Sequence, residues 1–251
     1  RQRQMCIRDR VMTVNEALAK LNTDRMKNSF LIHTLETEEA PEFHFSGNSA
    51  AVREKNTGFW LFSLDKKGDF TELYNKIDGE LGTFYVNSSE YFDEVQSNVR
   101  NATAQDYIQY VLESSEYRSN SASVNPEVTV VPLDQSWVGF ILSLYKSAEF
   151  GNEEYISACI DKHPGFGALV NGERVGYVTI HLDGEIGSMV ISEKARGKGV
   201  GRTLMQYITP KYAEQASIGC GFVLPENSCS QKMMVNSCFT ALKDKIMWVY
   251  H

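Results

Sequence analysis

A short run of alternating glycines carries the clearest chemical signal in this chain. Residues 196–202 read Arg-Gly-Lys-Gly-Val-Gly-Arg, between an apolar segment that ends at Ile191 and a segment with helical periodicity. Glycines at a strand-to-helix turn leave backbone N–H groups uncovered at the positive end of a helix dipole. Such a turn binds phosphate groups, and Arg196 and Lys198 add positive charge beside it. The pattern therefore predicts a diphosphate site.

The spacing of the glycines separates this turn from two other phosphate-binding loops. A dinucleotide-binding loop needs Gly-x-Gly-x-x-Gly, whereas this chain has Gly-x-Gly-x-Gly. An ATP-binding loop ends in Gly-Lys followed by Ser or Thr, and that ending is absent from the turn. A glycine-rich turn that binds no ligand is the third alternative.

What does fit is the pattern Arg-x-x-Gly-x-Gly, formed by Arg196, Gly199 and Gly201 after a strand that ends with Met189 and Ile191. This pattern resembles the pyrophosphate loop of the GNAT superfamily of acyl-CoA-dependent N-acyltransferases, and the resemblance extends over the second half of the chain. It implies an α/β fold with a mixed central sheet flanked by helices. It also implies acetyl-CoA or another acyl-CoA as co-substrate.

The resemblance further implies which residues bind the acyl-CoA. They are the strand end, the glycine turn and an asparagine after the next strand: Met189, Val190, Ile191, Arg196, Gly197, Lys198, Gly199, Val200, Gly201, Arg202 and Asn227. Backbone groups of Met189 and Ile191 would contact the pantetheine arm, and the Ile191 N–H would stabilise the oxyanion. In the family's second motif Met234 stands where Tyr, the usual general acid, is expected. Water, Tyr207 or a first-half residue must then protonate the thiolate.

Glu185 is the best candidate for the general base that removes a proton from the attacking amine. Counting by two, Glu185, Gly187, Met189 and Ile191 share one face of the strand. Some family members carry a glutamate base at about this place. An exposed carboxylate at a turn is the alternative for Glu185, and Glu226 is a second candidate base.

Composition narrows the class of protein. The chain has 251 residues, of which 42% are hydrophobic and 23% charged, and its net charge of −7 argues against a nucleic-acid-binding surface. No apolar run approaches the ~20 residues of a membrane span. Five cysteines without a Cys-x-x-Cys pair predict reduced thiols in a cytoplasmic protein, and the scattered histidines predict no metal site. The expected partners are acyl-CoA and a small amine acceptor, with the protein a monomer or homodimer.

The chain divides into two halves. Residues 1–11 have no apolar pattern and are interpreted as a non-native or disordered leader. The polar stretch 119–126 reads as a linker between an N-terminal α/β domain at 12–118 and an acyl-CoA-binding catalytic domain at 127–251. At the end of the second half, where the family usually closes with two strands, there is room for one. The first half or another subunit is therefore expected to supply part of the wall of the pocket that binds the acceptor.

The first half is interpreted as a degenerate GNAT-like copy, which makes the chain a tandem of two such units. Its order of strands and helices parallels the second half, with residues 60–62 matching 189–191 and 84–86 matching 221–223. In place of the glycine turn it has Asp-Lys-Lys-Gly-Asp at 65–69, whose acids cannot host a pyrophosphate. The sequence thus predicts an N-acyltransferase acting on a small-molecule or peptide amine, with a non-catalytic acyl-CoA sensor as the alternative.

Overall fold

The computed structural model describes residues 12–77, 81–118, 124–145 and 151–251. The expected leader at 1–11 and most of the expected linker, 119–123, lie outside these residues. The helices are α1 (Val14–Leu21), α2 (Ser29–Thr37), α3 (Asp69–Tyr74), α4 (Phe92–Asn98), α5 (Val138–Leu144), α6 (Glu153–Lys162), α7 (Val200–Ala213) and α8 (Ser228–Asn236). The strands are β1 (Glu42–Ser46), β2 (Ser49–Arg53), β3 (Trp60–Ser63), β4 (Phe84–Val86), β5 (Thr103–Glu113), β6 (Thr129–Pro132), β7 (Phe166–Val170), β8 (Glu173–Ile180), β9 (Ile186–Ile191), β10 (Ile218–Val223) and β11 (Thr240–Tyr250).

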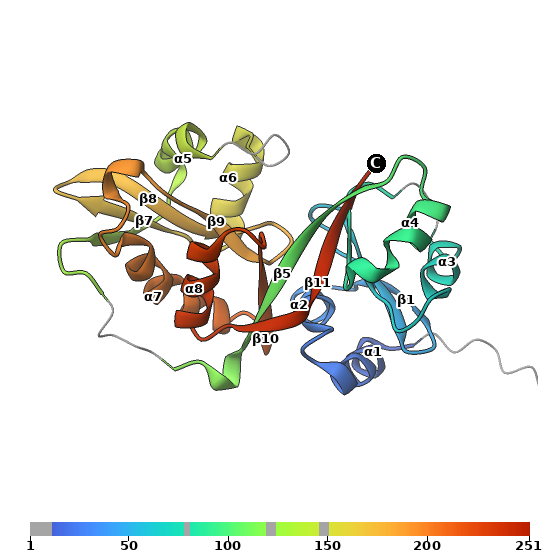
Figure 1. The fold of residues 1–251 in the computed structure, drawn as a ribbon. Helices are drawn as coiled ribbons and strands as arrows, with labels where there is room; N and C mark the ends of the chain where they lie inside the picture. Colours follow the sequence, from blue (N-terminus) through green and yellow to red (C-terminus); the bar gives the residue numbers. More distant parts are fainter. Residues whose placement is uncertain (1–11, 78–80, 119–123, 146–150) are drawn as a thin grey trace, which may run out of the picture.

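These strands form two sheets (Figure 1). The larger is a mixed seven-stranded sheet in the order β1-β2-β3-β4-β11-β5-β10, and the smaller is a four-stranded sheet in the order β6-β7-β8-β9. Helices flank both sheets, so the predicted mixed α/β fold is confirmed. Among the described helices, none has the length and apolar character that crossing a bilayer requires.

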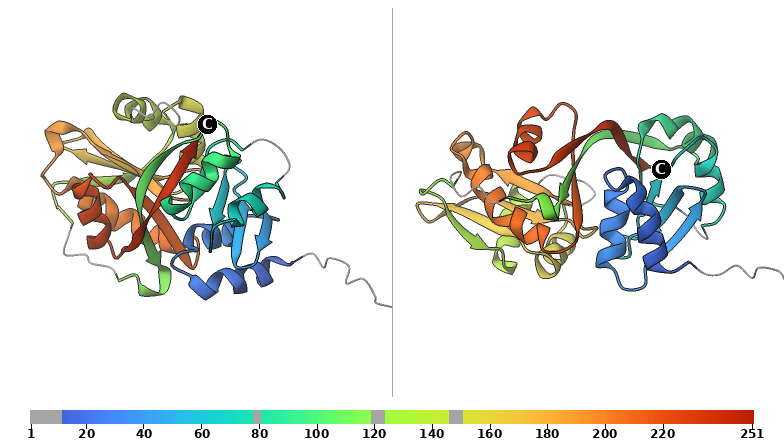
Figure 2. Two further views of the ribbon diagram at one scale, coloured as in Figure 1. Left: turned by 45° about the vertical axis from the view of Figure 1, so that its right-hand side comes forward. Right: turned by 90° about the horizontal axis from the view of Figure 1, so that it is seen from below.

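The larger sheet interleaves the two halves of the chain. Strand β5 of the first half lies between β10 and β11 of the second, and β11 in turn lies between β4 and β5. Both are 11 residues long, and they pass together through the middle of the molecule (Figure 2). Because β5 occupies the place beside β10, the second half needs only one strand of its own after α8.

Helices α1 and α2 cover one face of the first-half strands, and α3 and α4 cover the other. The alternation of side chains along β4 and β11 sorts the core into these two layers. Phe84, Val86 and Met247 pack in the layer of α3 and α4. Tyr85 and Trp248, one residue out of phase, pack with α1 and α2.

In the second half α7 packs on one face of the small sheet, and α5 and α6 lie on the other. Strands β7 and β8 meet in the hairpin turn Asn171-Gly172, where both residues have positive φ angles of 51° and 78°. Val178 belongs to the core layer of α7, whereas its neighbour Tyr177 is fully buried in the layer of α5 and α6. The small sheet is thereby fixed between helices, and its last strand, β9, borders the site.

Candidate functional site

Strands β9 and β10 meet at the boundary between the two sheets and then part. At their closest approach a Cβ atom on Gly221 would lie 2.7 Å from the carbonyl oxygen of Ile186. The buried hydroxyl of Tyr212 joins the strands there: it accepts from the Cys220 N–H at 2.8 Å and lies 2.9 Å from the Gly184 carbonyl oxygen. The two strands belong to different sheets, and a gap lies between them past this contact.

The gap between the parted strands is a cavity of about 260 Å³, which we call the splay cavity. Met189 of β9 lines one side, and Val223 of β10 and Asn227 line the other. Met234, which stands in the place of the usual tyrosine, lines its wall and is 6% exposed. The splay cavity is the place where the resemblance predicts the pantetheine arm.

Strand β9 is irregular where it borders the splay cavity. Ser188 has a φ of 49°, and the pairing of β8 with β9 shifts between Tyr177 opposite Val190 and Thr179 opposite Gly187. One residue of β8 therefore faces two residues of β9, which is a β-bulge. The expected alternation across residues 185–191 is consequently wrong. Val190 packs in the α5/α6 layer, whereas Met189 and Ile191 pack in the α7 layer, so Glu185 and Gly187 do not share their face.

The end of β9 presents backbone groups toward the gap. The Ser192 N–H donates to the Val175 carbonyl oxygen at 2.8 Å, which makes these two residues a hydrogen-bonded pair of the ladder. In an antiparallel pair the next residue directs its N–H and C=O to the opposite edge. Ile191, opposite Gly176, therefore turns its backbone groups away from β8. This is the orientation that an N–H donor to a bound thioester requires.

The glycine turn connects β9 to α7. Gly197 and Gly199 both have φ angles of 75°, a region that glycine enters without strain, and Gly199 is the N-cap of α7. The first N–H groups of a helix have no intrahelical acceptor, so they are available to an anion. Asn125 donates to the Lys198 carbonyl oxygen at 2.8 Å, and the Arg196 Nε donates to the Ile191 carbonyl oxygen at 3.3 Å.

The structure brings the predicted acyl-CoA-binding residues to one place, with two qualifications. Residues 189–202 run continuously from β9 into α7, and Asn227 lines the splay cavity from the opposite side. Asn227 also caps α8, because its Oδ1 accepts from the Ser230 N–H at 3.1 Å. Val190 turns toward α5 and α6, away from the layer of α7.

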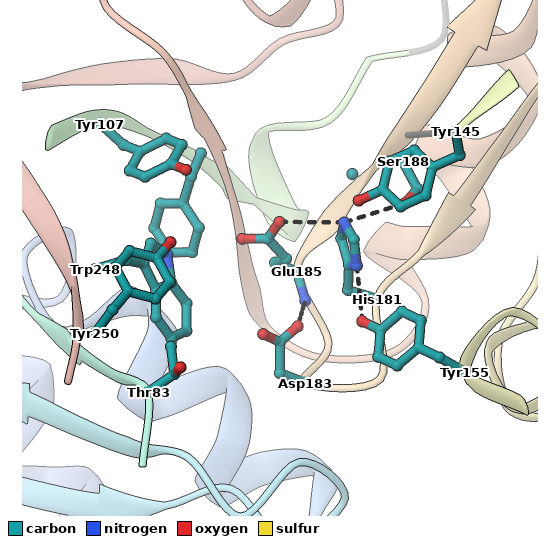
Figure 3. Close-up of a pocket in the computed structure, with 12 residues that line it drawn as sticks. Thr83, Tyr107, Tyr145, Tyr155, His181, Asp183, Glu185, Ser188, Trp248 and Tyr250 are labelled. Carbon is teal, nitrogen blue, oxygen red and sulfur yellow. Dashed lines mark hydrogen bonds and ion pairs between the residues drawn. The ribbon is translucent and has the colours of Figure 1, made fainter. Parts of the chain in front are cut away.

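A second cavity of about 280 Å³ adjoins the first, and we call it the acid–aromatic cavity (Figure 3). Both halves of the chain build it, since Thr83 and Tyr107 come from the first half and Trp248 and Tyr250 from β11. The two cavities share five lining residues: Tyr107, Tyr145, Gly187, Ser188 and Phe222.

A chain of polar side-chain contacts forms one face of the acid–aromatic cavity (Figure 3). Glu185 Oε1 lies 3.6 Å from His181 Nε2, which is 3.2 Å from the Ser188 hydroxyl. His181 Nδ1 lies 2.8 Å from the Tyr155 hydroxyl. The Glu185 N–H donates to Asp183 Oδ1 at 3.2 Å. Glu185 is thus a held carboxyl inside a cavity, and the alternative of an exposed carboxylate at a turn is wrong.

Burial sets the protonation states of this face. Burial raises the pKa of Glu185 well above its usual value, and the neighbouring charge of Asp183 raises it further. Burial also raises the pKa of Asp183 to about 7 and lowers the pKa of His181 to about 4. His181 is therefore neutral at neutral pH. Because burial also raises the pKa of Tyr155, its hydroxyl stays protonated.

Several predicted or alternative residues lie elsewhere, and others were missed. Glu226 is exposed and lines neither cavity, and Tyr207 is 42% exposed and packs against Phe166 outside both. Tyr107 and Tyr145 are instead the tyrosines that line both cavities. No local pattern marks them, because Tyr107 reaches the site only through the interleaving of β5. Within the described residues, no group of three or more His, Cys, Asp or Glu side chains is arranged to hold a metal ion.

The corresponding region of the first half is closed. Strands β3 and β4 form a parallel ladder, in which Trp60 pairs with Phe84 and Phe62 with Val86. The carboxylate of Glu94 accepts from the N–H groups of Gly68 at 2.9 Å and Thr71 at 3.0 Å, at the N-terminus of α3. The helix end that corresponds to the glycine turn thus already holds an anion from the protein itself.

Comparisons with known proteins agree with this geometry. Residues 140–234 match the family model described as Acetyltransferase (GNAT) family. No curated protein matches the chain. A solved structure of a Drosophila protein is similar with a TM-score of 0.65 and 12% identity, covering 95% of this chain and 90% of that one. A GCN5-related N-acetyltransferase-like protein from Streptococcus suis is similar with a TM-score of 0.56 and 12% identity, covering 94% and 99%.

A tandem arrangement is also found among solved structures. A tandem GNAT protein from the clavulanic acid biosynthesis pathway is similar with a TM-score of 0.51 and 11% identity, covering 94% of each chain. At these identities the similarity concerns the fold, whereas the family model identifies the domain. Residues 140–234 of this chain, which include β9, the glycine turn and α7, are therefore an acetyltransferase domain of the GNAT family.

Proposed function

We propose that this protein is an N-acyltransferase that moves an acetyl or other short acyl group from acyl-CoA to a primary amine by direct attack. One observation carries the proposal. The carboxyl of Glu185 lines a cavity that shares five lining residues with the splay cavity, so the proposed base lies next to the predicted thioester site. Proximity of this kind is the main requirement of direct acyl transfer.

The residues around the splay cavity fit acyl-CoA. The N–H groups of the glycine turn would hold the diphosphate, with the exposed cations Arg196 and Lys198 beside it. Met189 and Ile191 would contact the pantetheine arm along the open edge of β9. The first half supports this assignment as an internal comparison, because the corresponding helix end binds the carboxylate of Glu94. When bound, acyl-CoA supplies the activated acyl thioester.

Glu185 is proposed to accept a proton from the ammonium of the acceptor. A general base works best when its pKa lies near the working pH, and burial raises the pKa of this carboxyl in that direction. The neutral ring of His181 orients the carboxyl without competing for the proton. The Ile191 N–H is proposed to donate to the carbonyl oxygen as negative charge develops there.

The proton donor to the departing CoA thiolate is proposed to be Tyr107 or Tyr145. The thioether of Met234 carries no proton, so it cannot fill the role of the usual tyrosine. Tyr107 comes from the first half and Tyr145 from the end of α5, and both border the two cavities. Replacing each by phenylalanine separates the two candidates.

The domain assignment stays part of this proposal. Residues 127–251 would bind acyl-CoA, and residues 12–118 would complete the acceptor side without binding CoA. We further propose a cytoplasmic protein with reduced thiols, which is supported by the free thiols of Cys159, Cys220, Cys229 and Cys238.

The full chain tests the proposal directly. Purified protein is expected to bind CoA in calorimetry and to release thiol from acetyl-CoA in the presence of primary amines. Glu185→Gln is expected to keep CoA affinity and to lose turnover. CoA binding without turnover of any amine would instead identify the alternative, a non-catalytic acyl-CoA sensor.

A further inference from the structure

The acid–aromatic cavity has two chemically different faces (Figure 3). Asp183, Glu185 and His181 form one face, at the turn between β8 and β9. Tyr107, Trp248 and Tyr250 lie on the other. An acceptor in the cavity would therefore meet carboxyl groups on one side and aromatic rings on the other.

The aromatic face is held firmly by the interleaved strands. Trp248 and Tyr250 are two residues apart on β11 and so point to the same side. The ring of Trp248 packs edge-on against Phe59 and Phe222 at centroid distances of 5.5 Å and 6.0 Å, and the residue is only 8% exposed. A preformed aromatic surface of this kind favours a flat, apolar ligand group, because stacking needs no rearrangement.

The acidic face discriminates between acceptors by their charge. Burial disfavours the charged form of both Asp183 and Glu185, so a bound ammonium group would stabilise their carboxylates. A carboxylate next to the acceptor amine would bring a third acidic group to the same buried site. None of the described residues that line the cavity is Lys or Arg, so none of them offers such a carboxylate a counterion.

The size of the cavity limits the acceptor further. A volume of about 280 Å³ lies near the lower end of the range for small-molecule sites. It suits a single ring with a short chain better than a polypeptide or an oligosaccharide amine.

Resting on the proposed function, we propose that the acceptor is an arylalkylamine: a primary amine joined by a short alkyl chain to an aromatic ring, without a carboxylate beside the amine. The ammonium lies at Glu185 and the ring against Trp248 and Tyr250. In the reaction the N–C bond forms and the thioester C–S bond breaks. The ammonium loses two protons, of which one ends on the CoA thiol and the other leaves through Glu185.

Matched acceptor pairs test this inference in the full chain with saturating acetyl-CoA. Phenethylamine is compared with phenylalanine, and tyramine with tyrosine, since each pair differs only in the carboxylate. We expect kcat/KM to be higher for the amine by roughly 100-fold, as like-charge repulsion at a buried site requires. The kcat/KM for n-propylamine, which lacks the ring, is expected to be about tenfold lower than that for phenethylamine.

Substitutions test whether the aromatic face recognises the ring of the acceptor. Tyr250→Leu is expected to lower kcat/KM for phenethylamine by about tenfold and to leave n-propylamine within about twofold. The control is Tyr74→Leu, which removes an equally partly buried tyrosine that stacks on Phe70 in α3. It is expected to leave both values unchanged.

The outcomes separate the two proposals. Equal turnover of phenethylamine and phenylalanine, or of phenethylamine and n-propylamine, overturns the arylalkylamine assignment while acyl transfer stands. A Tyr250→Leu variant that slows both amines equally also overturns it. A chain that binds CoA but acetylates no amine overturns the proposed function and the acceptor class with it.

Discussion

The pair of buried carboxyls, Glu185 and Asp183, is the feature with the most consequences at the scale of single residues. Burial raises the pKa of both carboxyls, and the charge of Asp183 raises the pKa of Glu185 further. His181 cannot compensate, since its own burial keeps it neutral. The arrangement therefore keeps the pKa of the proposed base, Glu185, well above the usual value of a carboxyl group.

Glu185→Gln tests the base. An amide cannot accept the proton, so turnover at pH 7 is expected to fall by roughly 10²-fold. CoA affinity is expected to be unchanged, because Glu185 does not line the splay cavity. Turnover should partly recover at high pH, where the amine is deprotonated by solvent. A variant with the rate of the unmodified chain at all pH values would contradict the assignment.

Asp183→Asn tests whether the charge of Asp183 raises the pKa of Glu185. The asparagine Oδ1 can still accept from the Glu185 N–H, so the turn is retained while the charge is lost. Removing this charge should lower the pKa of Glu185. Since the base must be deprotonated, activity rises with pH, and this rise should move toward lower pH in the variant. The pH profile of kcat/KM measures the shift. If kcat/KM rises over the same pH range in the variant, burial alone controls the pKa of Glu185.

At the scale of elements, the parted strands and the glycine turn distinguish the two halves. Strands β9 and β10 part where β9 carries a bulge, whereas β3 and β4 continue as a ladder. The N-terminus of α7 follows two glycines with positive φ, whereas that of α3 is covered by Glu94. The two halves thus have the same order of strands and helix, but the second half forms an open site and the first half a closed one.

Gly201→Val tests the open site. A Cβ there would lie 3.3 Å from the sulfur of Met233 and 3.4 Å from that of Met189, and the further methyl groups of valine would enter the same space. CoA binding is expected to be lost in calorimetry. Gly139→Val is the control, because a Cβ at this helical glycine of α5 meets no atom within 4 Å. A folded Gly201→Val chain with full CoA affinity would refute the assignment.

Glu94→Ala tests the closed site. The variant loses the acceptor for two N–H groups at the start of α3, so the free energy of unfolding should fall by about 1 kcal/mol. The CoA stoichiometry should stay at one per chain, because β3 and β4 still pair beside the uncovered helix end. Chemical denaturation and calorimetry measure the two quantities. A second CoA bound by the variant would show that Glu94 alone blocks the first half.

At the scale of the whole molecule, the interleaved strands make the halves depend on each other. Strand β5 supplies the neighbour of both β10 and β11, and β11 supplies the neighbour of β4. The second half alone would leave the edges of β10 and β11 unpaired, and exposed strand edges favour aggregation. The interleaving also delivers Tyr107 to both cavities.

Dividing the chain after residue 123 tests this dependence. Each half produced alone is expected to aggregate or stay unfolded, and the two produced together are expected to form a 1:1 complex. Size-exclusion chromatography, CoA calorimetry and acetyl-CoA turnover measure the outcome. A soluble second half with full turnover would mean that the first half is a separate module.

The sequence alone determined the features whose signals lie within a few residues. The helix Val14–Leu21 begins at a capping box formed by Thr13 and Glu16, which lie three residues apart in the sequence. The hairpin at Asn171-Gly172, the glycine turn and the place of Glu185 before β9 also follow from local patterns.

Only the tertiary structure decided which distant segments meet. The largely apolar run at 107–112 indicates a strand but does not predict that β5 lies between β10 and β11. The bulge at Ser188 reversed the faces expected from counting by two, since one inserted residue moves every later side chain across the sheet. The joining of Tyr107, Glu185 and Trp248 in one cavity likewise depends on pairings between residues far apart in sequence. Such pairings are selected by the packing of the whole chain, which no local pattern records.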